Sequence, residues 1–142
     1  MLTLLLNIAL LAGVAFQTCA AAGSCKNAKW SLSFDKPGWS KCPTTFPYIN
    51  GLFRSKASRP SNDGIYRIEE AKCCNNGSSN AECVQVDWVS SFDRESNLNL
   101  CPSGYYLSGL YRSRGPNLHN IERAWCCKPR GAPHSYKSCY NE

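Results

Sequence analysis

Residues 68–74 read Ile-Glu-Glu-Ala-Lys-Cys-Cys, and residues 121–127 read Ile-Glu-Arg-Ala-Trp-Cys-Cys. Each stretch follows a Gly-Leu-aromatic-Arg-Ser block, at Gly51–Ser55 and Gly109–Ser113, and each block follows a Cys-Pro pair, at 42–43 and 101–102. The copies lie 59 residues apart at the first cysteine and 53 apart at the double cysteine, so their order is kept while their loops vary. This pattern is typical of two copies of one disulfide-stapled unit.

The segments between the cysteines predict an all-β fold, because short aromatic and branched runs alternate with turn residues and helical periodicity is hard to find. A glycine inside a strand marks a bulge or a close backbone approach, which we expect at Gly51 and Gly109. The sequence therefore predicts one small, disulfide-rich, compact all-β domain of two pseudo-symmetric repeats, at 30–83 and 88–139. Besides the two Ile-Glu-x-Ala-x-Cys-Cys segments, the expected strands are Trp30–Phe34, Tyr48–Arg54, Val84–Val89 and Tyr105–Arg112.

The first residues of the chain have the character of a secretion signal. Residues 2–16 are mostly apolar and uncharged, are too short for a good membrane span, and precede the small residues Ala20–Gly23. We expect a signal peptide at 1–22 and a secreted domain at 23–142, with no transmembrane segment. The formal net charge of +6 is carried by scattered basic residues, which favours solubility or an anionic partner such as a sulfated glycan over nucleic acid.

The ten cysteines of the chain predict disulfides rather than a metal site. Cys19 leaves with the signal peptide, and neither His119 nor His134 stands at a ligand-like spacing from a cysteine pair, so neither a metal nor a cofactor is expected. The nine cysteines expected in disulfides are Cys25, Cys42, Cys73, Cys74, Cys83, Cys101, Cys126, Cys127 and Cys139.

The repeat suggests how these cysteines pair. The first cysteine of each unit, Cys42 or Cys101, is expected to bond one member of the double cysteine, and the other member to bond the fourth cysteine, Cys83 or Cys139. This arrangement leaves Cys25 over, as an intermolecular bridge in a disulfide-linked dimer. Two alternatives stay open: Cys25 pairs with Cys83 or Cys139 while another thiol is buried, or cleavage after Ala15 retains Cys19 as a partner.

Each unit also repeats one acid and one base. Glu69 and Glu122 correspond, as do Arg54 and Arg112. The structural interpretation is an ion pair within each repeat, and the functional one is an arginine that faces a carboxylate or sulfate ligand. Aromatic and basic residues near the repeated glycine suggest two equivalent cationic binding sites, unless the two aromatic rings lie in the core. These candidate ligand-binding residues are Phe53, Arg54, Lys56, Arg59, Tyr111, Arg112 and Arg114.

The sequence offers little for catalysis. Glu69 and Glu70 are adjacent, so on a strand they point to opposite faces and cannot act on one bond. Neither histidine has a neighbouring nucleophile pattern, and no glycine-rich phosphate loop is present. We therefore expect a protein that is not an enzyme. Asn76-Gly77-Ser78 is a glycosylation sequon in a turn-like stretch.

The order of cysteine, Gly-Leu, aromatic-Arg-Ser and an acidic segment ending in cysteine resembles the repeats of the dermatopontin family of extracellular matrix proteins. The likeness covers residues 30–74 and 88–127, although the family's closing Asp-Arg-x-Trp-x-x-x-Cys is replaced here by Ile-Glu-x-Ala-x-Cys. It implies matrix adhesion, binding of proteoglycan or other glycans and, in invertebrates, shell-matrix or lectin roles. We expect an extracellular matrix or adhesive protein that binds acidic or sulfated glycans, such as a component of a skeletal or shell matrix. The rival interpretations are a soluble defence lectin and a secreted toxin or antimicrobial effector.

Overall fold

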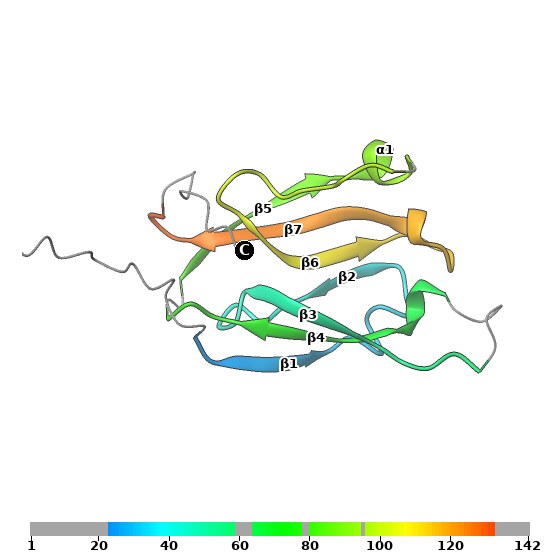
Figure 1. The fold of residues 1–142 in the computed structure, drawn as a ribbon, viewed down its shortest axis with the longest axis horizontal. Helices are drawn as coiled ribbons and strands as arrows, with labels where there is room; N and C mark the ends of the chain where they lie inside the picture. The colour runs from blue at the N-terminus through cyan, green and yellow to red at the C-terminus, as the bar shows by residue number, and fades with distance from the viewer. Residues whose placement is uncertain (1–22, 59–63, 78–79, 95, 133–142) are drawn as a thin grey trace, which may run out of the picture.

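The computed structural model describes residues 23–58, 64–77, 80–94 and 96–132, which form two antiparallel sheets in one compact domain (Figure 1). The predicted small, disulfide-rich all-β fold is confirmed. The strands are β1 (Cys25–Lys29), β2 (Gly38–Lys41), β3 (Tyr48–Arg54), β4 (Ile68–Cys74), β5 (Ala81–Asp87), β6 (Tyr106–Arg112) and β7 (Ile121–Pro129). The short helical turns are η2 (Ile65–Arg67), α1 (Val89–Phe92) and η3 (Leu118–Asn120).

The strand order shows both the repeat and one departure from it. Sheet A has the order β1-β4-β3, and sheet B has the order β2-β6-β7-β5. The central strands β4 and β7 are the repeated Ile-Glu-x-Ala-x-Cys-Cys segments, each flanked by equivalent neighbours. Strand β2 lies between β1 and β3 in the sequence, yet it pairs with β6 of the other sheet. This crossing strand ties the two units into one domain.

The double cysteine staples both faces of its sheet, because successive side chains of a strand point in opposite directions. Cys73 and Cys126 are fully buried and bond Cys42 and Cys101 on the core side. The following cysteines point the other way and bond the residues directly opposite on the neighbouring strand. These second bridges are Cys25–Cys74 between β1 and β4, and Cys83–Cys127 between β5 and β7.

The four bridges correct part of the predicted pairing. The bonds of Cys42 and Cys101 to the double cysteines are confirmed. The expected bonds Cys74–Cys83 and Cys127–Cys139 are wrong, because Cys74 is bonded to Cys25 and Cys127 to Cys83. Cys25 is bonded to Cys74, so the idea that it is left over for a disulfide-linked dimer is also wrong, as is a bond between Cys25 and Cys83. If the units are defined by their disulfides, each begins one strand earlier than expected: the first with Cys25 on β1 and the second with Cys83 on β5.

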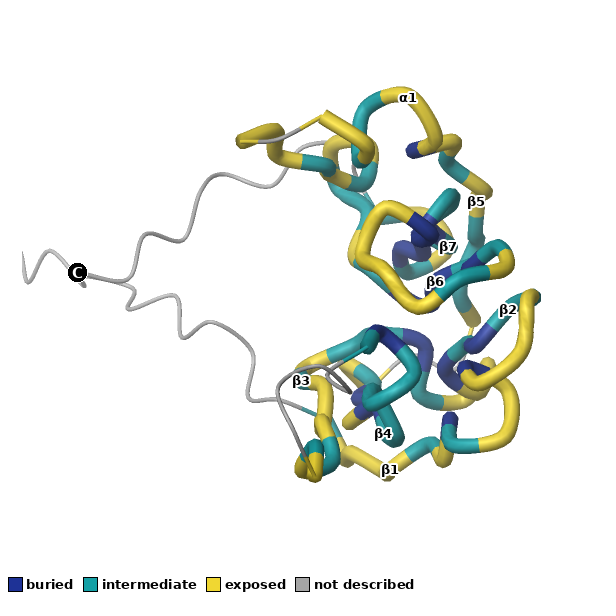
Figure 2. The backbone as a smooth tube through the Cα atoms, turned by 90° about the vertical axis from the view of Figure 1, so that its right-hand side faces the viewer, coloured by how far each residue is buried: buried dark blue, intermediate teal, exposed yellow. Residues whose placement is uncertain are grey.

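One hydrophobic core joins the two sheets. It contains Ala71 of β4 and Ala124 of β7, together with Trp30 and Trp88 from equivalent places in the two units. Figure 2 shows the buried backbone lying where the two halves face each other. The segment Trp30–Phe34 was expected as a strand but forms a turn, in which the Phe34 amide donates to the Trp30 carbonyl and the two rings stack.

The repeated glycines mark bulges, as predicted. The pairing of β3 with β4 shifts between Ile49 and Gly51, and the pairing of β6 with β7 shifts between Leu107 and Gly109. The surroundings of the two glycines differ. A Cβ on Gly109 would lie 2.7 Å from the Ser40 carbonyl oxygen of β2, whereas a Cβ on Gly51 would meet nothing within 4 Å. Gly109 is therefore required by the close approach of β2.

Several sequence predictions lie outside the described residues. They are the signal peptide at 1–22 with Cys19, and Arg59, His134 and Cys139. Asn76 of the sequon is exposed in the loop between β4 and β5. Within the described ranges, the structure contains no helix that is long and apolar enough to cross a membrane.

Candidate functional site: an aromatic and cationic surface on sheet B

The outer face of sheet B carries a cluster of aromatic and basic side chains. Leu110 and Ala124 are buried in the core, so their neighbours Tyr111, Arg123 and Trp125 point to the opposite face. Strand β2 adds two residues to the same face. Trp39 lies opposite Tyr111 in the register, and Lys41 lies opposite Gly109, which in turn pairs with Trp125. We call these five residues, Trp39, Lys41, Tyr111, Arg123 and Trp125, the Trp39–Trp125 surface.

The rings of this surface touch edge to face. The ring centroid of Trp39 lies 5.4 Å from that of Tyr111 and 5.7 Å from that of Trp125. The Lys41 ammonium is held between the two indoles, 3.4 Å from the Trp125 centroid and 4.4 Å from the Trp39 centroid. Because Gly109 has no side chain, the Lys41 side chain can cross it to reach Trp125.

The two cations of the surface are partly removed from water. Burial lowers the pKa of Lys41 from its ordinary value. The guanidinium carbon of Arg123 lies 5.2 Å from the Tyr111 ring centroid, and its buried Nε has no hydrogen-bond partner among the described residues. Cation–π contacts of this kind contribute roughly 0.5–2 kcal/mol, more as the cation loses water. They hold the Lys41 charge beside the two indole rings and the Arg123 charge beside the Tyr111 ring.

The equivalent face of sheet A is different. Phe53, Glu70 and Lys72 occupy the positions of Tyr111, Arg123 and Trp125, because both sets share one register around the repeated glycine. No strand among the described residues covers this part of β3, and Phe53 is 58% exposed. The two repeats therefore do not present equivalent sites.

The predicted site residues are scattered in the structure. Tyr111 belongs to the Trp39–Trp125 surface, while Phe53 and Arg54 stand at the edge of sheet A. Lys56 and Arg114 are exposed in loops that follow β3 and β6. The structure brings together one of the two predicted aromatic residues with basic residues that the sequence pattern did not single out.

Arg112 lies inside the molecule rather than in a site. It is 5% exposed, and its guanidinium donates hydrogen bonds to the backbone carbonyls of Asp35, Lys36 and Gly115. The predicted ion pair between Arg112 and Glu122 is therefore wrong. Glu122 instead accepts a hydrogen bond of 2.6 Å from the Ser113 hydroxyl.

The repeated glutamates share one structural role. Glu69 accepts a hydrogen bond of 3.0 Å from the Ser55 hydroxyl, which is the counterpart of the Ser113–Glu122 bond in the other unit. The repeated acid is thus linked to the serine that follows the repeated arginine. We assign these pairs to the stability of each strand pair and not to ligand binding.

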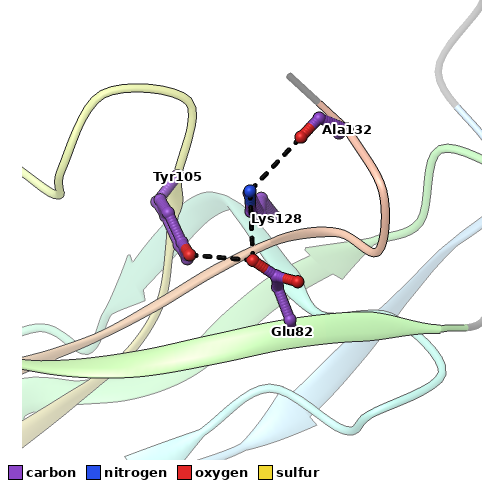
Figure 3. A network of polar contacts seen from close by, with 4 residues as sticks. All are labelled: Glu82, Tyr105, Lys128 and Ala132. Atoms are coloured by element: carbon purple, nitrogen blue, oxygen red, sulfur yellow. Dashed lines mark hydrogen bonds and ion pairs between the residues drawn. The ribbon is translucent and has the colours of Figure 1, made fainter. Parts of the chain in front are cut away.

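A polar network beside β7 also has a structural role (Figure 3). The ammonium of the buried Lys128 lies 3.0 Å from a carboxylate oxygen of Glu82 and donates to the Ala132 carbonyl. The Tyr105 hydroxyl donates to the same carboxylate oxygen. Burial and then the hydrogen bond and charge of Glu82 raise the pKa of Tyr105, while Lys128 acts in the opposite direction. The network anchors the loop before β6 to β5 and β7.

Four residues of the surface were not predicted from the sequence: Trp39, Lys41, Arg123 and Trp125. They come together only because β2, from the first unit, pairs with β6, and the sequence of a four-residue strand does not indicate its partner. One signal could have found them. Trp39 stands where the second unit has Leu98, and Trp125 where the first unit has Lys72, so both tryptophans are additions to the shared pattern. Residues that break a repeat are candidates for function rather than for folding.

The described residues include no cluster of histidine, cysteine, aspartate and glutamate suited to hold a metal ion. Fold and surface together define a class: a small β domain of two disulfide-stapled units, with an aromatic and cationic surface on one of its two sheets. Comparisons with protein-family models, with curated proteins and with solved structures found no match to this chain.

Proposed function

We propose that this chain is a secreted adhesive or extracellular matrix protein that binds acidic or sulfated glycans through the Trp39–Trp125 surface. The observation that supports this most is the pair of indole rings with a lysine ammonium held 3.4 Å and 4.4 Å from their centroids. Aromatic rings suit the apolar faces of sugars, and a fixed cation beside them suits a sulfate or carboxylate group.

Charge at the surface favours an anionic ligand. Lys41 and Arg123 lie on the same face of sheet B, on opposite sides of the ring cluster. Both cations are fixed by ring contacts, so little side-chain freedom is lost when an anion binds. Asp87 lies opposite Arg123 in the register of β5 and β7, so we expect Lys41 to contribute more than Arg123.

The position of the site on the face of a sheet favours a polymer. Three cavities of the described residues lie beside Gly51, beside Arg54 and beside Leu100, and the Trp39–Trp125 surface lines none of these three. An open face lets a long chain lie across it, whereas a small molecule gains affinity from enclosure. The net charge of +6 would add long-range attraction to a polyanion. Secretion is part of the same proposal, because four disulfides persist in an oxidising compartment.

Retention on immobilised heparin tests the proposal, with the unsulfated polymer of the same backbone as the matched column. We expect the wild-type protein to be retained on heparin, to elute with salt, and to be held more weakly on the unsulfated column, which keeps only the carboxylates of its uronic acids. The Lys41→Gln and Trp125→Ala variants should elute at lower salt than a Lys26→Gln variant, which removes an exposed charge from β1 of the other sheet. Equal elution of all three variants would contradict the assigned surface.

A lectin of body fluids is the second candidate, and the cluster of three aromatic rings, Trp39, Tyr111 and Trp125, is the observation that favours it. A lectin would bind the unsulfated column as well and would be eluted by a free sugar rather than by salt. That result, with the same loss in Trp125→Ala, would keep the surface and replace the ligand class.

A further inference from the structure

The two sheets differ in one structural respect: the outer edge of β6 is occupied by β2, while the equivalent edge of β3 is open among the described residues. The strands share the sequence Gly-Leu-aromatic-Arg, at Gly51–Arg54 and Gly109–Arg112. We propose that the open edge of β3 binds residues 97–100 from a second copy of this chain, as one added antiparallel strand.

The pairing of β2 with β6 is a template for this contact. Strand β2 directly precedes Cys42, and residues 97–100, Asn-Leu-Asn-Leu, directly precede Cys101. The correspondence extends to side chains. Ser33 and Ser40 are hydrogen-bonded to each other at 2.6 Å in the first unit, and their counterparts Ser91 and Asn99 are hydrogen-bonded in the second. Residues 97–100 are thus the second unit's version of β2, and they form no strand.

The open edge has the room that a strand needs. In the template, β2 approaches so closely that a Cβ on Gly109 would lie 2.7 Å from the Ser40 carbonyl oxygen. The same glycine is present at Gly51, where a Cβ would meet nothing within 4 Å. A bulge there accounts for the strand's shape but not for this empty space. The space would fit the backbone of an added strand, which the described residues do not supply.

Both partners carry exposed apolar side chains, beside the exposed polar Arg54 and Asn97. Leu52 and Phe53 at the edge of β3 are 46% and 58% exposed, and Leu98 and Leu100 are 78% and 65% exposed. A shallow cavity of about 290 Å³ beside Gly51 is lined by these two edge residues, with Asn27, Glu70 and Lys72 around them. The β2 register would place Leu98 against Phe53 and Leu100 against Gly51, over this cavity.

The occupant is assigned to a second copy because the segment is held away from its own β3. The Asn97 side chain donates to the carbonyl of Ser91 in α1, a bond that the first unit lacks because Gly38 stands at the corresponding place in β2. Figures 1 and 2 both place α1 and the chain that follows it beside sheet B, far from β3 of sheet A. Each molecule therefore offers one open edge and one unused strand segment, and added strands are a common mode of protein association.

Sedimentation velocity of the secreted, oxidised protein tests the inference. We expect the wild type to associate as its concentration rises at physiological salt. A Leu98→Glu/Leu100→Glu variant should raise the apparent dissociation constant about tenfold or more, because two buried leucines are lost from the contact. The matched control is Leu32→Glu/Leu118→Glu, which changes two other exposed leucines and should associate as the wild type does.

The Gly51→Val variant tests the edge. It should fold normally, because the new side chain meets open space in the single molecule, but it should not associate, because that side chain occupies the place of the added strand. Mixing it with the Leu98→Glu/Leu100→Glu variant should restore association, because one protein keeps the segment and the other keeps the edge. A wild type that stays monomeric at every concentration would overturn the inference. So would a mixture that stays monomeric, because an intact segment and an intact edge would then not bind each other. These measurements need no glycan, so they succeed or fail separately from the proposed function.

Discussion

Arg54 and Arg112 hold the same place in the repeated motif but have different surroundings. Arg54 is exposed at the edge of sheet A, whereas Arg112 is buried and joins the loop before β2 to the loop after β6 through three carbonyls. The difference follows from β2, because the loop that leads into it brings the carbonyls of Asp35 and Lys36 to Arg112. One motif residue has become a structural cross-link in one unit alone.

Replacing Arg112 by methionine should therefore cost about 2–4 kcal/mol of unfolding free energy, because buried carbonyls lose their donors. Arg54→Met should cost less than about 1 kcal/mol, as surface substitutions usually do. Urea unfolding followed by tryptophan fluorescence gives both values. A similar loss in the two variants would contradict the assigned role of Arg112.

The pKa of Lys41 gives the proposed site a pH dependence. Burial lowers this pKa below the ordinary lysine value of 10.5, so the ammonium loses its proton at a lower pH than an exposed lysine does. The protonated form is the one that attracts a sulfate group. Affinity for heparin should therefore fall as the pH rises through the lowered pKa, and remain full below it.

Heparin affinity measured over alkaline pH checks this dependence. The matched variant is Lys41→Arg, whose charge persists to higher pH and should remove the early decline. A decline that is unchanged in Lys41→Arg would assign the titration to another group.

At the scale of the elements, β2 accounts for most of the difference between the two units. It covers the edge of β6, requires a glycine at 109, and brings Trp39 and Lys41 to the outer face of sheet B. Without a counterpart on sheet A, the equivalent face keeps an open edge and an exposed phenylalanine. The four residues of β2 thus complete the proposed glycan surface on sheet B. Sheet A has no equivalent strand among the described residues, and this leaves the proposed docking edge.

Alanine at the two repeated glycines should separate these roles. Gly109→Ala should lower stability by about 1–3 kcal/mol, because the new Cβ would clash with the backbone of β2. Gly51→Ala should be neutral or should stabilise by about 0.4–1 kcal/mol, since its Cβ meets open space and the unfolded chain loses freedom. Thermal unfolding of both variants measures the difference, and equal melting temperatures would contradict the close approach of β2.

The sequence predicted those elements whose signal is local. The alternation and the glycine within β3 and β6 identified both strands and their bulges, and the Ile-Glu-x-Ala-x-Cys-Cys segments are the central strands. The alternation in Trp30–Phe34 misled, because its two aromatic residues stack within one turn instead of facing one side of a strand. The partner of β2 depends on a contact across about seventy residues, which no local pattern encodes.

At the scale of the whole molecule, the disulfides set the frame of the repeat. The prediction placed the first cysteine of each unit at Cys42 and Cys101, and it therefore assigned the wrong partners to Cys74 and Cys127. Their true partners, Cys25 and Cys83, lie on β1 and β5, which precede the Cys-Pro pair where the sequence repeat begins. Each bridge closes a loop with a sequence separation of 25 to 49 residues. Such bridges contribute about 3–4 kcal/mol each in the chain-entropy model, which is large for a domain of this size.

The bridges should differ in their resistance to reduction. Cys25 is exposed on the edge strand β1, whereas Cys42, Cys73 and Cys126 are buried. Under limiting reductant we expect Cys25–Cys74 to be reduced before Cys42–Cys73 in the first unit, because a thiolate must reach a disulfide sulfur before thiol–disulfide exchange can occur. Differential alkylation followed by mass spectrometry measures the order and also verifies all four pairs. Early opening of Cys42–Cys73 would contradict the burial described for the core.

The account as a whole depends on where the glycan binds, and the four tryptophans report this directly. Trp30 and Trp88 are buried in the core, while Trp39 and Trp125 form the proposed surface. Titration with a sulfated oligosaccharide, followed by the indole N–H signals in NMR and assigned with single Trp→Phe variants, is the most direct test. We predict that the signals of Trp39 and Trp125 shift with the ligand while those of Trp30 and Trp88 stay in place. Shifts absent from Trp39 and Trp125 at saturating ligand would contradict the proposed site.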